Sequence, residues 1–409
     1  MNLNFSWPWS RKNAMTTGDL YKELLARASV KSGVAVNYKT AMEAGTSLAC
    51  ARVIAEGIAQ VPFKLFKERA GGGMDAAKDH GLYDLLANKP NEWQTSFELR
   101  EQIGFHLAFM TNAYVFKVRG LRGQLVELLP FEPNMVTVRR TADWNRVYTV
   151  RTIDGGQIDV PPQDMWHLRG LSWDGISGIP GVKLAREAIG LAMAMEEHGA
   201  RMFSNGAKPG GVLSTDGSLK EDQVKLLRES WEVAQGGNEN AYKTAILFGG
   251  LKFQPMAMTG VDAQHLEQRR FQVEEICRFF RVLPIMVGHA DKAMTFASAS
   301  EMFLAHVVHT MMPWYTRIEN SADVNLLTDE ERLQKGLYTK FMAAALLRGS
   351  HKDRAEYFKA ALGAGGSPAW MTQDEVRALE EMNPMGGDAA KLPIATNVPK
   401  TQGANDAQA

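Results

Sequence analysis

The sequence lacks the residues and segments that mark several large classes of protein. Its 409 residues include only two cysteines, Cys50 and Cys277, too few for a disulfide framework or a cysteine-rich metal site. Both lie among apolar neighbours in predicted helices, so we expect buried free thiols in a reducing cytoplasm. No run of about 18 uninterrupted apolar residues occurs, so no membrane span is expected. Residues 1–12 also lack the apolar core of a secretory signal.

The chain also lacks an excess of either charge. Lys plus Arg and Asp plus Glu each number 46, which gives a formal net charge of zero. Proteins that hold duplex DNA tightly without sequence preference neutralise phosphates with a basic surplus. We therefore expect no tight nucleic-acid binding, whereas weak, sliding contact with DNA remains compatible with this balance.

Motifs that carry chemistry are missing as well. The sequence has no phosphate-binding glycine–lysine loop, no zinc-protease histidine pair and no Cys-x-x-Cys. His306 and His309 are three residues apart on a predicted helix, but no suitably spaced third ligand accompanies them, which favours packing or solvent exposure over metal binding. The sequence therefore gives no catalytic residue, no metal ligand and no cofactor.

Periodicity predicts an α+β body. Apolar spacing typical of helices occurs at residues 47–60, 80–87, 96–110 and 182–204, and residues 63–68 alternate as a strand. A series of short strands with turn residues between them indicates an antiparallel sheet. These strands are expected at residues 113–118, 125–129, 135–139, 146–151 and 165–168.

The next part of the chain indicates an elongated insertion. Ser218 and Glu221 form a capping box at the start of a helix over residues 218–235. A short β segment, residues 243–258, turns at Gly249-Gly250. A helix over residues 262–281 then returns and stops at Leu283-Pro284, so the pattern is helix, β tip, helix.

The returning helix has one apolar stripe and balanced charge elsewhere. Arg270 with Glu274, and Glu274 with Arg278, are predicted ion pairs at i,i+4 spacing. Such a helix suits side-by-side packing in a ring or bundle, although an ordinary amphipathic surface helix has the same pattern. The stripe consists of Leu266, Val273, Ile276, Cys277 and Phe280.

The remaining segments complete the predicted order. After the loop that follows Pro284, a helix is expected from Ser298 to Met312, before Pro313, within a longer helical region that reaches residue 320. Capping boxes at residues 328–331 and 372–375 predict further helices. Residues 1–36 are expected to be loosely ordered. The tail from residue 383, which contains Gly, Pro and Asn, is expected to be disordered.

Several short segments occur in a fixed order along the chain: residues 50–56 with Val61-Pro62, 88–91 with Thr95, 111–114, 129–133, 203–209, 211–213, 249–250, 262–264 with Leu266-Glu267, 274–280, 346–348 and 374–377. Taken in this order, they resemble the portal proteins of tailed bacteriophages. The resemblance spans about residues 39–393 and is carried by the ordered set rather than by any one piece. Thr111 departs from it, since the family usually has glycine there, and Leu283 precedes Pro284 where a second Pro or Val-Pro-Pro is common.

The resemblance implies a portal-like α+β fold. It has an antiparallel-sheet wing body, a helical-hairpin stem, a small β clip and a C-terminal helical crown. The corresponding assignments are residues 37–217 for the wing, 218–235 and 261–282 for the stem helices, 236–260 for the clip, 283–297 for the tunnel loop, 298–320 for a long helix that returns to the wing, and 321–382 for the wing and crown helices.

The resemblance also implies a function without catalysis. Family members form a homo-oligomeric ring, expected to be a dodecamer, at one vertex of the capsid. The ring is the conduit for DNA packaging by terminase and for DNA ejection. Its expected partners are the terminase large subunit, the head–tail adaptor, the major capsid or scaffold protein and, transiently, double-stranded DNA. The expected location is the virion, after synthesis in the cytoplasm of a bacterial host.

Three sets of candidate residues follow from these assignments. The tunnel-loop set is expected to touch DNA sterically and weakly, because Asp291 opposes the one lysine. The other two sets are expected to pack neighbouring stems and to dock partners at the clip. The sets are His289, Asp291, Lys292, Met294, Thr295 and Phe296 for the loop; Glu267, Arg270, Glu274, Arg278 and Arg281 for the stem; and Lys243, Phe248, Lys252 and Phe253 for the clip.

Two other interpretations remain open at this point. One is a different connector or adaptor ring of the virion, against which the length and the β-rich body argue. The other is a soluble α+β enzyme whose site is not recognisable from the sequence. The mass of the purified protein separates a ring of several hundred kilodaltons from a monomeric or dimeric enzyme.

Overall fold

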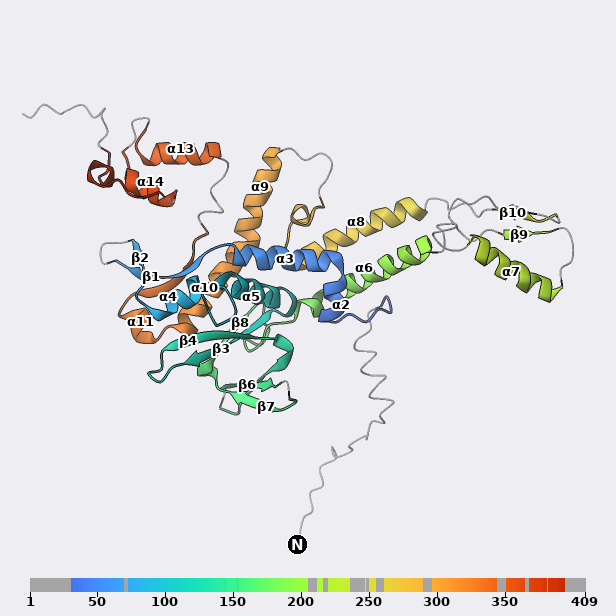
Figure 1. The fold of residues 1–409 in the computed structure, drawn as a ribbon, viewed down its shortest axis with the longest axis horizontal. Coiled ribbons are helices and arrows are strands. Elements are labelled where there is room, and N and C mark those ends of the chain that lie inside the picture. Colours follow the sequence, from blue (N-terminus) through green and yellow to red (C-terminus); the bar gives the residue numbers. More distant parts are fainter. Residues whose placement is uncertain are drawn as a thin grey trace, which may run out of the picture. The chain divides into compact units, whose positions relative to one another are not determined.

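A computed structural model describes most of the chain (Figure 1). The described residues are 31–69, 73–143, 145–152, 154–204, 212–215, 220–235, 247, 250–254, 261–289, 296–343, 351–364, 368–380 and 382–393. They divide into two compact units. The first contains Met1–Thr295 and Val308–Phe341, and the second contains Phe296–Val307 and Met342–Ala409.

Two helices form the centre of the first unit. α3 (Gly45–Ala59) packs along α5 (Ser96–Met110), and both lie close to where the sequence predicts them. Thr95 caps α5: its hydroxyl accepts the amide of Glu98, whose carboxylate in turn accepts the amide of Thr95. The short helix α2 (Tyr38–Glu43) precedes α3 in sequence, and the short helix α4 (Gly81–Ala87) lies between α3 and α5.

The predicted strands are present, but they form two antiparallel sheets instead of one. β3 (Asn112–Arg119) lies between β4 (Leu125–Phe131) and β8 (Met165–Arg169). The second sheet is a meander of β5 (Val136–Arg140), β6 (Arg146–Arg151) and β7 (Gln157–Val160), the last of which the sequence analysis missed. The single-sheet expectation was wrong because alternation identifies a strand but not its partner.

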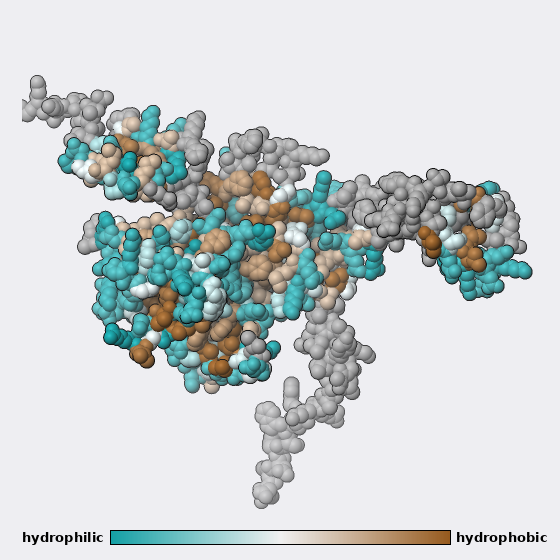
Figure 2. Space-filling model, viewed as in Figure 1, coloured by the Kyte–Doolittle hydropathy of each residue, from teal (hydrophilic) through white to brown (hydrophobic). Residues whose placement is uncertain are grey.

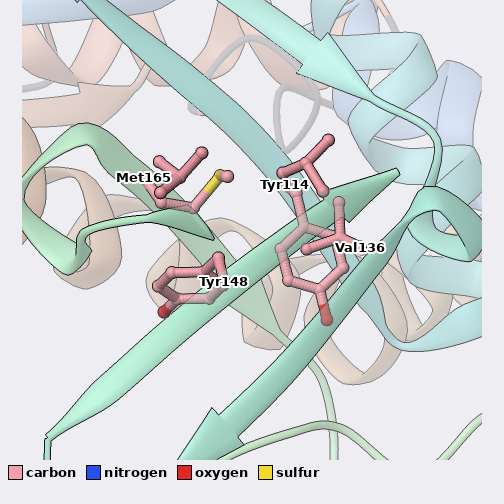
Figure 3. Close-up of a cluster of buried hydrophobic side chains, with 6 residues drawn as sticks. Tyr114, Val136, Tyr148 and Met165 are labelled. Carbon is pink, nitrogen blue, oxygen red and sulfur yellow. The ribbon is translucent and has the colours of Figure 1, made fainter. Parts of the chain in front are cut away.

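The two sheets share one apolar core. Figure 3 shows Tyr114 of β3 and Met165 of β8 facing Val136 and Tyr148 of the meander. Tyr114 and Tyr148 are edge-to-face, with ring centroids 6.1 Å apart. This core fixes the sheets against each other, since burial of aromatic side chains dominates the packing energy of such clusters.

A third antiparallel sheet joins distant parts of the chain. β1 (Phe63–Glu68) lies between β2 (Met74–Ala76) and β11 (Leu337–Phe341), and Phe63 stacks on Phe341 at 4.4 Å. Residues 321–382 were expected to be helical, so β11 is a correction. Five residues of alternating pattern give a weak signal, and this strand depends on its pairing with β1.

The helix pair of the insertion differs from the expected one. α8 (Val261–Phe280) packs against α6 (Gly181–Ser204), not against α7 (Glu221–Gln235) as the sequence analysis assumed. α7 lies in sequence between β9 (Val212–Ser214) and β10 (Lys252–Gln254), which pair antiparallel. An apolar stripe shows that a helix has a partner but not which helix that partner is. Ser218 and the predicted turn residue Gly249 lie outside the described residues.

Proline 313 does not end a helix. α9 (Phe296–His306) is followed by a π-helical turn (Val307–Met311) and by α10 (Met312–Leu326), so the helical backbone passes Pro313. Proline is tolerated there because the carbonyl of His309, four residues earlier, accepts the guanidinium of Arg281 at 3.1 Å in place of the N–H that proline lacks. The predicted capping box at Thr328 and Glu331 begins α11 (Asp329–Leu333).

The second unit contains α9, α13 (His351–Ala361) and α14 (Gln373–Leu379). The capping box at Thr372 is present, and Arg354 pairs with Glu380 at 2.5 Å. The tail was expected to be disordered from residue 383, but Asp374 accepts the amides of Met385 and Gly386, and a 3-10 turn follows at Gly387–Ala390. Backbone capture by a carboxylate orders this segment despite its composition. Residues 1–30 and 394–409 lie outside the described residues.

The described residues show neither a membrane-spanning helix nor a metal-binding cluster. No helix among them is long and apolar enough to cross a membrane. They also contain no group of three or more histidine, cysteine, aspartate or glutamate side chains arranged to hold a metal ion.

Candidate functional site: the α6–α8 helix pair and its flanking segments

One face of α8 is buried against the body. Ile276 and Cys277 are each 1% exposed, and Phe280 meets Phe109 of α5 edge-to-face at 6.1 Å. Gln272, which is buried, donates its side-chain amide to the Ala188 carbonyl of α6 at 3.0 Å. The predicted stripe is therefore correct for its C-terminal half, while the side chain of Leu266 lies outside the description.

The other face of α8 carries the candidate packing residues. All five are exposed: Glu267, Arg270, Glu274, Arg278 and Arg281. Phe271 and Phe279 are exposed beside them, 55% and 49% respectively, and α6 adds Leu184 and Leu191 at 49% and 43%. Exposed apolar side chains of this size among charges are typical of a surface that another protein covers.

The predicted ion pairs of α8 differ in register. Arg278 pairs with Glu275, three residues earlier, instead of with Glu274. Glu274 instead faces His289, with 3.8 Å between its carboxylate oxygen and the imidazole Nε2. Spacings of three and four residues are both within reach on a helix, so sequence alone does not select between the two carboxylates.

α8 ends at a left-handed residue ahead of the predicted Leu283-Pro284 stop. Arg281 has φ +55°, and the amide of Val282 donates to the Cys277 carbonyl at 3.0 Å, which is a Schellman-type cap. Thr310 donates its hydroxyl to the Arg281 carbonyl at 2.6 Å, and the Arg281 guanidinium donates to the His309 carbonyl at 3.1 Å. These bonds tie the end of α8 to the turn that leads into α10.

Both cysteines are buried free thiols, as the sequence predicts. Their sulfur atoms lie 3.7 Å apart, with Cys50 on α3 and Cys277 on α8. The hydrogen bond with Cys277, together with burial, raises the pKa of Cys50, so this side chain stays a thiol near neutral pH. Their adjacency could not be read from the sequence, where they are separated by more than two hundred positions.

Only the first part of the predicted tunnel loop is described. Residues Pro284–Val287 form a 3-10 turn, Gly288 adopts φ +77°, and His289 is half-buried. Phe296 begins α9, and its side chain is outside the description. Asp291, Lys292, Met294 and Thr295 lie outside the described residues, so their contact with DNA stays a prediction.

The predicted clip is described in part. Lys252 is exposed and stands opposite Ser214 in the β9–β10 ladder. Exposed apolar side chains occur on α7 as well: Val224 (43%), Leu226 (71%) and Val233 (80%). Figure 2 shows brown apolar residues among teal polar ones in the region of α7. Lys243, Phe248 and the side chain of Phe253 lie outside the description. The α7 residues were missed because no motif distinguishes them from an ordinary amphipathic helix.

A hollow of about 250 Å³ adjoins the exposed face of the pair. It lies among α5, α6, α8 and α10 and is mainly apolar, with Arg281 and Arg317 at its polar side. The lining includes Leu107, Thr111, Leu184, Phe279, Phe280 and Trp314. No aspartate, glutamate, histidine or cysteine is among the residues that line this hollow.

Comparison with known proteins identifies the family. The sequence profile described as "Phage portal protein" matches residues 46–381. The "Probable portal protein" of Streptomyces phage phiC31 is 30% identical over 380 residues, which cover 90% of this chain and 81% of that protein. The "Portal protein" of Enterobacteria phage HK97 is 28% identical over 369 residues, which cover 90% of this chain and 85% of that protein. The chain therefore belongs to the phage portal protein family, whose members are structural components of the head–tail connector.

Solved structures share its fold. The neck of an empty gene transfer agent particle, computed with C6 symmetry, aligns with a TM-score of 0.60 at 23% identity, covering 85% of this chain and 94% of that chain. A crystal structure of an HK97 family phage portal protein from Corynebacterium diphtheriae aligns with a TM-score of 0.53 at 15% identity, covering 77% of this chain and 98% of that one. The portal-like α+β fold class is thereby confirmed. Family membership favours the portal over the adaptor ring and the enzyme.

Proposed function

We propose that the chain assembles into a dodecameric ring at one capsid vertex and serves there as the conduit for DNA packaging and ejection. The observation that carries the proposal is the exposed outer face of the α6–α8 pair, where Phe271 and Phe279 stand among paired and unpaired charges. Family membership supports the ring, since the neck of a related gene transfer agent particle was computed with C12 symmetry. A closed ring covers such faces on every copy.

The proposed stem is α6 with α8, in place of the α7–α8 pair that the sequence suggested. The contacts between α6 and α8 and the Gln272–Ala188 hydrogen bond support this revision. The proposed clip is the excursion closed by the β9–β10 ladder and including α7, and the proposed tunnel loop is residues 283–297. Zero net charge suits a conduit, because DNA must move past the surface without being held.

The clip is proposed to dock the terminase large subunit and then the head–tail adaptor. The exposed apolar residues of α7, Leu226 above all, support a docking role. A two-stranded ladder is marginal alone in water, so it is expected to pair with neighbouring copies. Deleting residues 238–258 and measuring terminase binding checks this assignment; retained binding would contradict it. Contact with the major capsid or scaffold protein is assigned to the wing.

The test of the ring is the mass and shape of the purified full-length protein. Twelve copies of the 45.2 kDa chain give particles of about 540 kDa. Mass photometry is expected to show this species, and negative-stain class averages are expected to show a central hole wide enough for duplex DNA. Monomers or dimers at every protein and salt concentration, with no central hole, would overturn the proposal.

A further inference from the structure

A hollow of about 460 Å³ lies on the first unit, where β6, β8 and the loop after β8 meet α10. It is distinct from the apolar hollow beside α8, and neither the stem nor the clip assignment uses it. Its lining is polar and basic, and includes Arg146, Tyr148, His167, Arg169, Arg317 and Ser321.

The three guanidinium groups of this hollow are not neutralised by carboxylates. Arg169 donates to the Gly175 carbonyl, and Arg317 donates to the carbonyls of Arg169 (3.1 Å) and Gly170 (2.8 Å). The side chain of Arg146 makes no hydrogen bond or ion pair with any residue that the structure describes. No aspartate or glutamate is among the lining residues. Neutral carbonyls orient the first two groups but leave their charge in place.

Two aspartates lie near the hollow, but neither is among its lining residues. Asp174 attracts Arg169, but its Oδ1 already accepts the amides of Ile176 (2.8 Å) and Ser177 (3.0 Å). Asp143 lines an adjoining hollow together with Arg146, and within the described residues no ion pair joins the two. Burial, followed by the positive charges of Arg169 and Arg146, lowers the pKa of His167 to about 3. His167 is therefore neutral near pH 7 and adds no charge.

The hollow also offers a neutral donor. Ser321 accepts the indole N–H of Trp166 at 3.0 Å, so its own hydroxyl hydrogen is available to donate. His167 is engaged elsewhere, since its Nε2 lies 3.0 Å from the side-chain Oδ1 of Asn112 and its Nδ1 faces the Tyr148 hydroxyl at 3.4 Å. The groups that can receive a ligand thus include the three arginines, Ser321 and the side-chain amide of Asn320.

We propose that this hollow binds a phosphate dianion, either free phosphate or the terminal phosphate of a nucleotide or DNA end. The charge of the lining favours a multiply charged anion: three guanidinium groups line the hollow and no carboxylate does, and the nearby Asp174 and Asp143 offset their charge only in part. A phosphate monoester carries about −1.5 to −2 near pH 7, whereas a carboxylate or a phosphodiester carries only one negative charge. Guanidinium forks bind phosphate oxygens in a bidentate manner, which neutral donors cannot match.

The test is anion binding to the full-length protein, measured by calorimetry at matched ionic strength. Inorganic phosphate and sulfate are expected to bind, and acetate and chloride are not. Arg146→Ala is expected to weaken phosphate binding at least about tenfold, the effect of losing a charge-assisted contact of roughly 1.4 kcal/mol or more. Arg151→Ala is the matched control, because it removes an exposed arginine from the same strand that does not line the hollow, and it is expected to bind as the native chain does. Thermal melts without added anion confirm that both variants fold.

Three results would overturn the proposal. Absence of phosphate binding would do so, and so would equal phosphate affinity of the native chain and Arg146→Ala. Acetate binding as tight as phosphate binding would assign the hollow to a carboxylate, such as an acidic side chain of a partner. The source of the phosphate is separated by a further comparison of a 5′-phosphorylated oligonucleotide with the same strand lacking that phosphate. Tighter binding of the phosphorylated strand indicates a DNA end, and equal binding with retained phosphate affinity indicates the free ion.

Discussion

At the scale of single residues, Thr111 is held in a conformation that suits glycine. Its φ is +51°, which costs a β-branched residue about 1–2 kcal/mol. Its hydroxyl donates to the Ile179 carbonyl at 2.5 Å, and its own carbonyl accepts the amide of Gly170 at 2.7 Å. The hydroxyl bond offsets part of the backbone cost. This explains how threonine occupies a position where the resemblance to portal proteins leads one to expect glycine.

The first prediction separates these two effects. Thr111→Val keeps the backbone strain and removes the hydroxyl bond, so the free energy of unfolding should fall by about 1–3 kcal/mol. Thr111→Gly removes both the strain and the bond, so its change should be smaller. Denaturant unfolding of both variants measures the difference. A valine variant as stable as the native chain would show that the bond to Ile179 contributes nothing.

At the scale of elements, the close approach of α3 and α5 depends on Gly104. A Cβ atom at this position would lie 2.7 Å from the Cα atom of Ala55, which is backbone and cannot rotate away. The two helices carry the core of the first unit, including the buried residues Ile54, Ile58 and Leu107. Separation of these helices would disturb the cap of α8 through the Cys50–Cys277 contact.

Gly104→Ala is therefore expected to destabilise the protein by about 1–3 kcal/mol, the usual cost of overpacking. Gly45→Ala is its control, because Gly45 begins α3 and an added Cβ would meet nothing within 4 Å. This control should be neutral or stabilising by about 0.4–1 kcal/mol. Thermal unfolding compares the two, and equal stability would refute the close-packing argument.

The outer face of α8 provides a second element-scale prediction. Phe271→Ala should lower the fraction of protein in rings at a fixed concentration, because an exposed phenylalanine covered by a neighbour contributes much of its binding energy. The stability of the single chain should change by less than about 0.5 kcal/mol, as for other exposed positions. Gln268→Ala, an exposed polar position on the same helix, is the control. Mass photometry reads the ring fraction, and unchanged assembly of the Phe271 variant would remove this face from the interface.

At the scale of the whole molecule, we expect DNA packaging through the proposed conduit to depend more on the length of the tunnel loop than on its charge. Lys292→Glu should have a mild effect, since Asp291 already opposes this lysine in sequence. Removing three residues from 290–295 should block DNA packaging or let packaged DNA slip out, while rings still form. Packaging assays with assembled rings compare the two variants. Normal packaging and retention by the shortened chain would leave the loop as a simple helix connector.

The sequence by itself determined the features that depend on neighbouring residues. The α5 helix begins and ends where predicted because the Thr95–Glu98 capping box and the apolar spacing act within a few residues. The capping boxes at Thr328 and Thr372, the buried state of both thiols and the strands of the wing follow from the same local physics. The ordered set of short segments was also enough to indicate the portal family, which the comparisons confirm.

Only the tertiary structure decided which elements are partners. β8 pairs with β3, although the strands of the meander lie between them in sequence. β11 pairs with β1, and α8 packs on α6 instead of α7. The proximity of Cys50 to Cys277 and the gathering of Arg146, Arg169 and Arg317 arise in the same way. A periodic pattern indicates that one face of an element is buried, but any apolar face of similar width could be the one that covers it. The choice among partners is made by packing and pairing between residues far apart in the chain.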